Sequence, residues 1–173
     1  MRFRLISIVF ALMMAAPASS QSDALSDALE RMIAAYGGEE NLQKLDSMGV
    51  VTVLNLRNRI SDKRKAQNTS LTLVRLPINT WKMSMGHIVK ALRLIETSEK
   101  PVAIHCLHGS DRTGAVVAAY RMIYEDWTKE EAILEFRNEI FGYHEKWFPN
   151  ILSLLNSIDI EALKKELEYN KVD

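Results

Sequence analysis

Residues 105–114 read HCLHGSDRTG, and this stretch predicts both the fold and the site of the protein. It follows the apolar run 102–104 and precedes residues 115–120, AVVAAY, which are typical of the first turns of a helix. A strand, a tight loop and a helix N-terminus form an anion site in this order, because the loop N–H groups and the helix dipole converge on one point. We therefore expect an anion to bind between this strand and this helix.

A thiol begins the loop and a guanidinium ends it. We expect Cys106 to be an ionised nucleophile, because the N–H groups at a helix N-terminus and a nearby cation stabilise a thiolate. Arg112 offers a planar fork that can bind two phosphate oxygens, and its hold tightens as a transferring phosphoryl group flattens. Gly109 and Gly114 allow the backbone to turn and to approach the anion. A lone cysteine is more often a buried apolar side chain, but this setting favours catalysis at Cys106.

The pattern His105-Cys-x5-Arg112-Thr113-Gly114 resembles the signature loop of the cysteine-based protein tyrosine and dual-specificity phosphatases. Residues 48–57, MGVVTVLNLR, are similar to a strand of the compact bacterial members, and residues 118–122 and 141–144 are similar to segments that follow their loop. The resemblance covers roughly residues 35–155. It implies a single α/β domain with a central, mostly parallel sheet and helices on both faces.

The resemblance also implies a mechanism. Cys106 would attack phosphorus and form a phospho-cysteine, which water would hydrolyse without a metal or another cofactor. His105 would fix the loop and help to keep the thiolate charged, and Thr113 would donate its hydroxyl to the departing sulfur. The phosphoryl oxygens would be bound by the loop as a whole, whose residues are Leu107, His108, Gly109, Ser110, Asp111 and Arg112.

The general acid of the family is absent from its usual place. Family members carry an Asp on an upstream loop, but the equivalent residues 76–84, LPINTWKMS, contain no Asp or Glu. Asp111 could take this role, as proposed for the loop Asp of myotubularin-like and Sac-like lipid phosphatases, or it could orient Arg112 or cap the helix. Asp62 could reach in from the loop after residues 50–57, or it could be an ordinary solvated charge. The third interpretation is that no side chain protonates the leaving group.

The remaining histidines do not predict a metal site. His108 lies within the loop, where it either borders the pocket mouth or is solvated. His87 and His144 are isolated in the sequence, without a partner at ligand spacing. We therefore expect no metal.

The predicted substrate is phosphotyrosine, with phosphoserine and phosphothreonine as further substrates, by resemblance alone. The partner would then be a phosphorylated protein. The Asp-Arg-Thr ending of the loop also suits a phosphorylated lipid or small molecule, namely a phosphoinositide or an inositol phosphate. A different class stays open as well: a pseudophosphatase that binds phosphorylated partners without turnover, which the missing upstream Asp favours.

The first twenty residues predict a cleaved secretory signal peptide. Arg2 and Arg4 precede an apolar stretch at 5–16, and small residues follow it. The phosphatase domain would then span residues 21–173 in the periplasm or outside the cell, without a stable membrane anchor. Removing residues 1–20 takes away two Arg and no acid, so 22 basic and 22 acidic residues become 20 and 22, a net charge of −2. This balance gives no support for a nucleic-acid partner.

Hydrophobic periodicity and turn residues predict alternating strands and helices in one domain. Thr128 and Glu131 form a predicted capping box, which starts a helix. Strands are expected at 50–56, 71–76 and 102–105, and helices at 21–36, 39–48, 83–97, 112–124, from 128, 144–156 and 159–169.

Overall fold

The sheet consists of three parallel strands, in agreement with the prediction. The computed structural model describes residues 39–169, so the predicted signal peptide and the predicted helix at 21–36 lie outside the described residues. The strands are β1 (Thr52–Arg57), β2 (Thr72–Ile78) and β3 (Val102–His105), in the order β2-β1-β3. All of β1 is buried, because it lies between two neighbours and is covered on both faces.

Strand β2 runs two residues further than the pattern at 71–76 predicts. Pro77 is tolerated because β2 is an edge strand, where a missing N–H breaks no ladder bond. The register shifts near the end, so that Arg57 of β1 pairs with Ile78. The carboxyl ends of β1 and β2 therefore lie side by side, at the edge of the sheet where β3 also ends.

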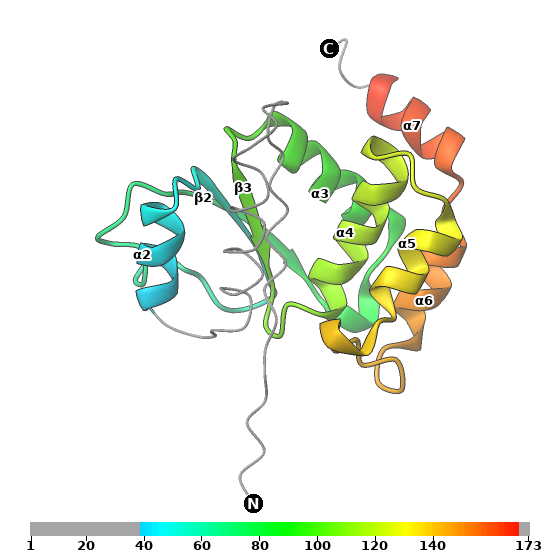
Figure 1. Cartoon of the computed structure of the whole chain (residues 1–173), viewed down its shortest axis with the longest axis horizontal. Coiled ribbons are helices and arrows are strands. Elements are labelled where there is room, and N and C mark those ends of the chain that lie inside the picture. The colour runs from blue at the N-terminus through cyan, green and yellow to red at the C-terminus, as the bar shows by residue number, and fades with distance from the viewer. Residues whose placement is uncertain (1–38, 170–173) are drawn as a thin grey trace, which may run out of the picture.

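Helices cover both faces of the sheet (Figure 1). Helix α2 (Glu39–Ser47) lies on one side, where Leu42 and Leu45 pack against Val53 and Ala103. The other helices lie on the opposite side and enclose the larger core. They are α3 (Met85–Thr97), α4 (Asp111–Tyr124), α5 (Lys129–Phe136), α6 (Pro149–Asn156) and α7 (Ile160–Tyr169). Within the described residues, no helix has the length and apolar character needed to cross a membrane.

Helix α4 is the centre of the larger core. Its residues are buried almost all round, because it lies between the sheet and a second layer formed by α5 and α6. Gly114 permits the close approach of α5: a Cβ at this position would lie 2.9 Å from the ring of Phe136. The predicted capping box is confirmed, since Thr128 and Glu131 cap the start of α5 reciprocally. This packing fixes the N-terminus of α4 against β3.

The predicted helix at 144–156 begins only at Pro149. Proline favours the first helical turn and disfavours helix in the residue before it, so residues 142–148 remain a loop. The hydroxyl of Tyr143 donates to the carbonyl oxygen of Phe148 over 2.7 Å, and its ring lies 4.1 Å from that of Phe136. Burial raises the pKa of Tyr143 to about 12, so the hydroxyl stays a donor. The loop is thus held against α5 next to the start of α4.

Candidate active site

Cys106 lies between the end of β3 and the start of α4, as the sequence predicts. Its side chain is fully buried. Gly109 has φ +75°, a left-handed conformation that favours glycine and turns the loop toward the helix. Leu107 is exposed and His108 half-buried, whereas Ser110 and the first residues of α4 are buried. The strand, loop and helix N-terminus of the predicted anion site are therefore present.

Arg112 is anchored to the sheet. Its Nη1 donates to the carbonyl oxygen of Ile78 over 3.2 Å and faces that of Leu56 at 3.5 Å. These carbonyls lie at the carboxyl ends of β2 and β1, so the backbone holds the guanidinium at the sheet edge where Cys106 follows β3. A cation fixed in this way needs little rearrangement to bind an anion.

Three buried polar groups of this segment have no hydrogen-bond partner among the described residues. They are Nε of Arg112, Oγ of Ser110 and Oγ1 of Thr113. A buried donor without a partner costs free energy, which a bound ligand can remove. Because all three can donate, the ligand that suits them is an anion.

His105 is held by Asp62, which lies 43 residues earlier in the chain. Nε2 of His105 is 2.7 Å from Oδ2 of Asp62, and both side chains are largely buried. The interpretation of Asp62 as a solvated loop charge is therefore wrong. The carboxylate also accepts from Asn55 Nδ2 over 2.7 Å and pairs with Arg57. These contacts engage both of its oxygens.

The charge of Asp62 is stabilised by these partners. Burial alone would raise the pKa of the Asp62 carboxyl, but the hydrogen bonds and positive charges of His105 and Arg57 outweigh it and lower the pKa below its ordinary value. Asn55 and Arg57 lie at the carboxyl end of β1, so this ionic network joins the loop after β1 to the residue before Cys106.

Asp111 is bound by His144. The Asp111 carboxylate is buried and accepts from the backbone N–H of His144 over 3.0 Å, while Nδ1 of His144 lies 3.1 and 3.2 Å from its two oxygens. The ring of His108 lies 5.4 Å from that of His144. The expectation that His144 is isolated is therefore wrong: the loop at 142–148 brings it to the start of α4.

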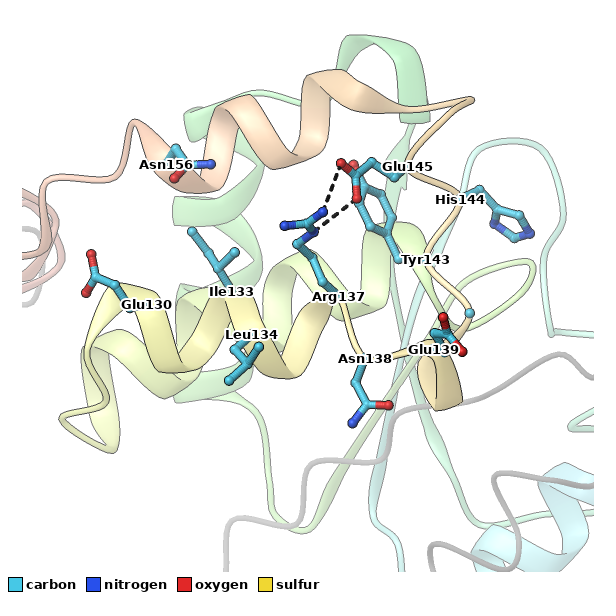
Figure 2. A pocket seen from close by; sticks show the side chains of 11 residues that line it. Glu130, Ile133, Leu134, Arg137, Asn138, Glu139, Tyr143, His144, Glu145 and Asn156 are labelled. Atoms are coloured by element: carbon cyan, nitrogen blue, oxygen red, sulfur yellow. Dashed lines mark hydrogen bonds and ion pairs between the residues drawn. The ribbon is translucent and has the colours of Figure 1, made fainter.

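An open groove runs beside this cluster, between α5 and the residues that follow it (Figure 2). It has a volume of about 1220 Å³, and its lining includes three glutamates, Glu130, Glu139 and Glu145, and one arginine, Arg137. Arg137 binds Glu145 through two hydrogen bonds of 3.0 and 3.3 Å, and His144 stands apart from this pair at the edge of the groove. Cys106 and Arg112 do not line it.

An exposed tryptophan lies on the segment that follows β2. Trp81 belongs to the short 3-10 helix Thr80–Lys82, is 62% exposed, and meets Phe148 edge to face with the ring centroids 5.1 Å apart. Asn150 Nδ2 donates to the carbonyl oxygen of Thr80 over 2.9 Å and ties this segment to α6. The segment starts two residues after Ile78, whose carbonyl holds Arg112, so it adjoins the anion site.

Residues 27–125 match the family described as "Polymorphic toxin system, DSP-PTPase phosphatase". The match takes in more than half of the 173 residues, including the whole loop from His105 to Gly114. The chain belongs to this DSP-PTPase family.

Individual relatives agree with the family. The chain is 26% identical over 125 residues to the dual specificity protein phosphatase TpbA of Pseudomonas aeruginosa, a match that covers 71% of this chain and 55% of that protein. The chain thus spans about half the length of the curated relatives it matches. A crystal structure of P. aeruginosa TpbA is similar with a TM-score of 0.70 at 23% identity, covering 78% of this chain and 84% of that one.

A second similar structure comes from a eukaryote. It is the core catalytic domain of the PP-IP phosphatase Siw14 from S. cerevisiae, with a TM-score of 0.65 at 19% identity, covering 79% of this chain and 85% of that one. These likenesses show a shared cysteine phosphatase fold.

Sequence analysis does not predict two contacts of the candidate site in this DSP-PTPase chain. The role of Asp62 depends on which way the loop after β1 folds back, and its sequence neighbours, Lys63 to Lys65, suggest a solvated segment. His144 lies 33 residues from Asp111, and the helical pattern predicted at 144–156 conceals the loop that carries it. The sequence signal for this loop is Pro149, because proline favours the first turn of a helix and so indicates that the helix begins there.

Proposed function

We propose that this DSP-PTPase chain hydrolyses phosphotyrosine in proteins, and to a lesser extent phosphoserine and phosphothreonine, through a phospho-cysteine. The observation that carries the proposal is Cys106 buried at the end of β3, one loop away from an Arg112 that two strand-end carbonyls hold in place. A thiolate and a fixed guanidinium on one anion site suit phosphoryl transfer, whereas a site that only binds phosphate needs no thiol.

The reaction would proceed in two steps. In the first, the Cys106 thiolate attacks phosphorus, an S–P bond forms, and the ester P–O bond breaks with departure of the tyrosine oxygen. In the second, water attacks phosphorus, the S–P bond breaks, and phosphate leaves while the thiolate is restored. A proton from this water returns to the group that protonated the tyrosine oxygen. Arg112 and the loop N–H groups bind the phosphoryl oxygens in both steps, and the hydroxyl of Thr113 donates to the departing sulfur.

The departing oxygen needs a proton, and we assign it to the pair formed by Asp111 and His144. Both lie at the start of α4 beside the loop, and Nδ1 of His144 is within hydrogen-bond reach of the carboxylate. Asp62 is engaged by Asn55, Arg57 and His105, which supports a positioning role for it. It would hold His105, and thereby the start of the loop.

Asp111→Asn is expected to slow hydrolysis according to the leaving group. Asparagine fills the same space but cannot share a proton with His144. We expect turnover of phosphotyrosine to fall by about 10²-fold or more, and turnover of p-nitrophenyl phosphate, whose leaving group needs no proton, to fall much less. Initial rates of phosphate release measure both, with the exposed Asp126→Asn as the control. Equal losses on the two substrates would contradict the assignment.

Trp81→Ala is expected to weaken the binding of aromatic substrates. The segment that carries this exposed indole starts two residues after Ile78, whose carbonyl holds Arg112, so we expect the indole to offer an apolar face to a phosphotyrosine ring. Such contacts are worth about 1 kcal/mol. We expect KM for a phosphotyrosine peptide to rise roughly fivefold with little change in kcat, and KM for a phosphoserine peptide to stay the same. The exposed Trp147→Ala serves as the control. A uniform change on both peptides would argue against this contact.

A phosphoinositide or inositol phosphate is the second candidate substrate. Asp62 joins its loop to His105, and this contact brings the basic run Lys63 to Lys65 toward the edge where the anion site lies. Such a run attracts a substrate with several phosphates. Against it, the groove beside His144 is lined by three glutamates and one arginine, and this excess of negative charge repels a polyanion. The balance favours a protein substrate.

Phosphate release by the full chain under reducing conditions tests the proposal. The substrates are a phosphotyrosine peptide, a phosphoserine peptide, a phosphoinositide and an inositol phosphate, and Cys106→Ser provides the blank. We expect the highest kcat/KM on the phosphotyrosine peptide. Binding of that peptide without release from any substrate would instead identify a pseudophosphatase.

We also propose that residues 1–20 direct the chain out of the cytoplasm, to the periplasm or beyond, because their pattern is that of a signal peptide. Expression of the full chain in a Gram-negative host tests this. The N-terminal sequence of the protein released from the periplasm should start near residue 21.

A further inference from the structure

Three side chains that the sequence keeps apart meet at the edge of the phosphate loop. His108 comes from the loop, Asp111 from the first turn of α4, and His144 from the loop at 142–148. One ligand atom from each lies within 4.8 Å of the others. Only 2% of the surface of Asp111 is exposed, so this is not a chance cluster of solvated acids.

We propose that His108, Asp111 and His144 form an inhibitory binding site for Zn²⁺. Two imidazoles and one carboxylate are a donor set that zinc prefers, and they leave a fourth position open for water or another ligand. Magnesium and calcium prefer oxygen ligands alone, so they fit this site poorly. The ion would be a regulator of the site and not a cofactor of the reaction.

The distances suit the ion. Zinc lies about 2.0–2.2 Å from its ligand atoms, so two ligands of a tetrahedral site are roughly 3.3 Å apart. Nδ1 of His144 lies 3.1 and 3.2 Å from the oxygens of Asp111, close to that separation. His108 has to move by no more than about 1.5 Å to complete the site, which a side-chain rotation of this half-buried loop residue can supply.

The charges are also favourable. The buried carboxylate of Asp111 attracts a cation, and the imidazole of the half-buried His108 lies beside it. The guanidinium of Arg112 repels a cation, and the Asp111 carboxylate offsets this. Because His144 also borders the open groove, the ion has a path from solvent (Figure 2).

Zinc bound here would stop the reaction in a specific way. It would bind the lone pairs of Asp111 and His144, so that these groups could no longer carry the proton for the leaving group. It would also link the loop at 142–148 to the phosphate loop. The inhibition rests on the proposed function, whereas the binding site rests only on the positions of three side chains.

Calorimetric titration of ZnCl₂ into the full-length Cys106→Ser protein tests the proposal. This background removes the thiolate, which is itself a strong zinc ligand. We expect one ion per chain, and an affinity at least about tenfold lower when His144→Ala or His108→Ala is added. Adding His87→Ala, a histidine that instead caps α3, should leave the affinity unchanged. MgCl₂ should give no binding.

Circular dichroism melting confirms that each variant is folded. The proposal fails if the Cys106→Ser protein binds no zinc. It fails equally if binding survives both His144→Ala and His108→Ala. Because the readout is binding, either failure is distinct from a failure to find phosphatase activity.

Discussion

Cys106→Ser is expected to reduce phosphate release from a phosphotyrosine peptide by at least about 10⁴-fold, a loss of the order seen when a nucleophile is removed. Serine is nearly isosteric, but a hydroxyl is a far poorer nucleophile than a thiolate at neutral pH. The side chain is fully buried between β3 and α4, so the exchange of one atom leaves the loop and Arg112 in place. The measurement is the initial rate of phosphate release at saturating substrate.

A measurement of peptide binding distinguishes the loss of the nucleophile from the loss of the folded site. We expect the Cys106→Ser protein to bind the phosphotyrosine peptide within a few-fold of the wild-type KM, because the phosphoryl oxygens contact Arg112 and the backbone. A fall in rate accompanied by loss of binding would mean that Cys106 maintains the loop and does not attack. An unchanged rate would exclude Cys106 as the nucleophile.

Asp62→Asn is expected to cause the largest loss of stability of any polar substitution proposed here. The amide keeps the shape of the carboxylate but leaves Arg57 buried without its counter-charge and disrupts the contact with His105. Breaking a buried ion pair from one side costs about 3–5 kcal/mol. For a domain of this size, that cost lowers Tm by roughly 6–20 °C. Thermal unfolding followed by circular dichroism measures it, with Asp126→Asn as the exposed control.

The pH dependence of this effect has a definite sign. The pKa of Asp62 is lower in the folded protein than its ordinary value of 3.8. Its contribution to stability is therefore fully present above about pH 5 and is lost as the pH falls through the folded pKa. We expect the Tm difference between wild type and Asp62→Asn to be constant near neutral pH and to shrink below pH 4. A difference that grows on acidification would contradict the network.

The sequence predicted the parts of the fold that local patterns determine. The apolar runs at 50–56 and 102–105 correspond to β1 (Thr52–Arg57) and β3, whose residues are largely buried on both faces of the sheet. Gly109 and the helical residues after it predict the turn between Cys106 and Arg112. The capping box at Thr128 is equally local. The parallel order of the strands, with helices on both faces, came from the family resemblance and is confirmed.

The contacts that lie outside local patterns were not predictable. Asp62 is buried because the loop after β1 returns to His105, a contact 43 residues apart that no spacing rule reveals. His144 contacts Asp111 because α6 begins only at Pro149, which leaves residues 142–148 as a loop, and because Tyr143 packs on Phe136. In both cases a single polar residue in a charged or mixed segment acquires its role only through tertiary packing.

The complete burial of Cys106 has a consequence for the shape of the substrate. A buried sulfur can attack only a phosphorus atom that enters the protein surface as far as the sulfur. The phosphoryl group therefore has to stand at the tip of an arm, while the chain that bears it remains outside. The phenyl ring of phosphotyrosine is a rigid arm of this kind, and the single methylene of phosphoserine is much shorter. Under the proposed function, this burial would favour a phosphoryl group on a long side chain over one on a short side chain.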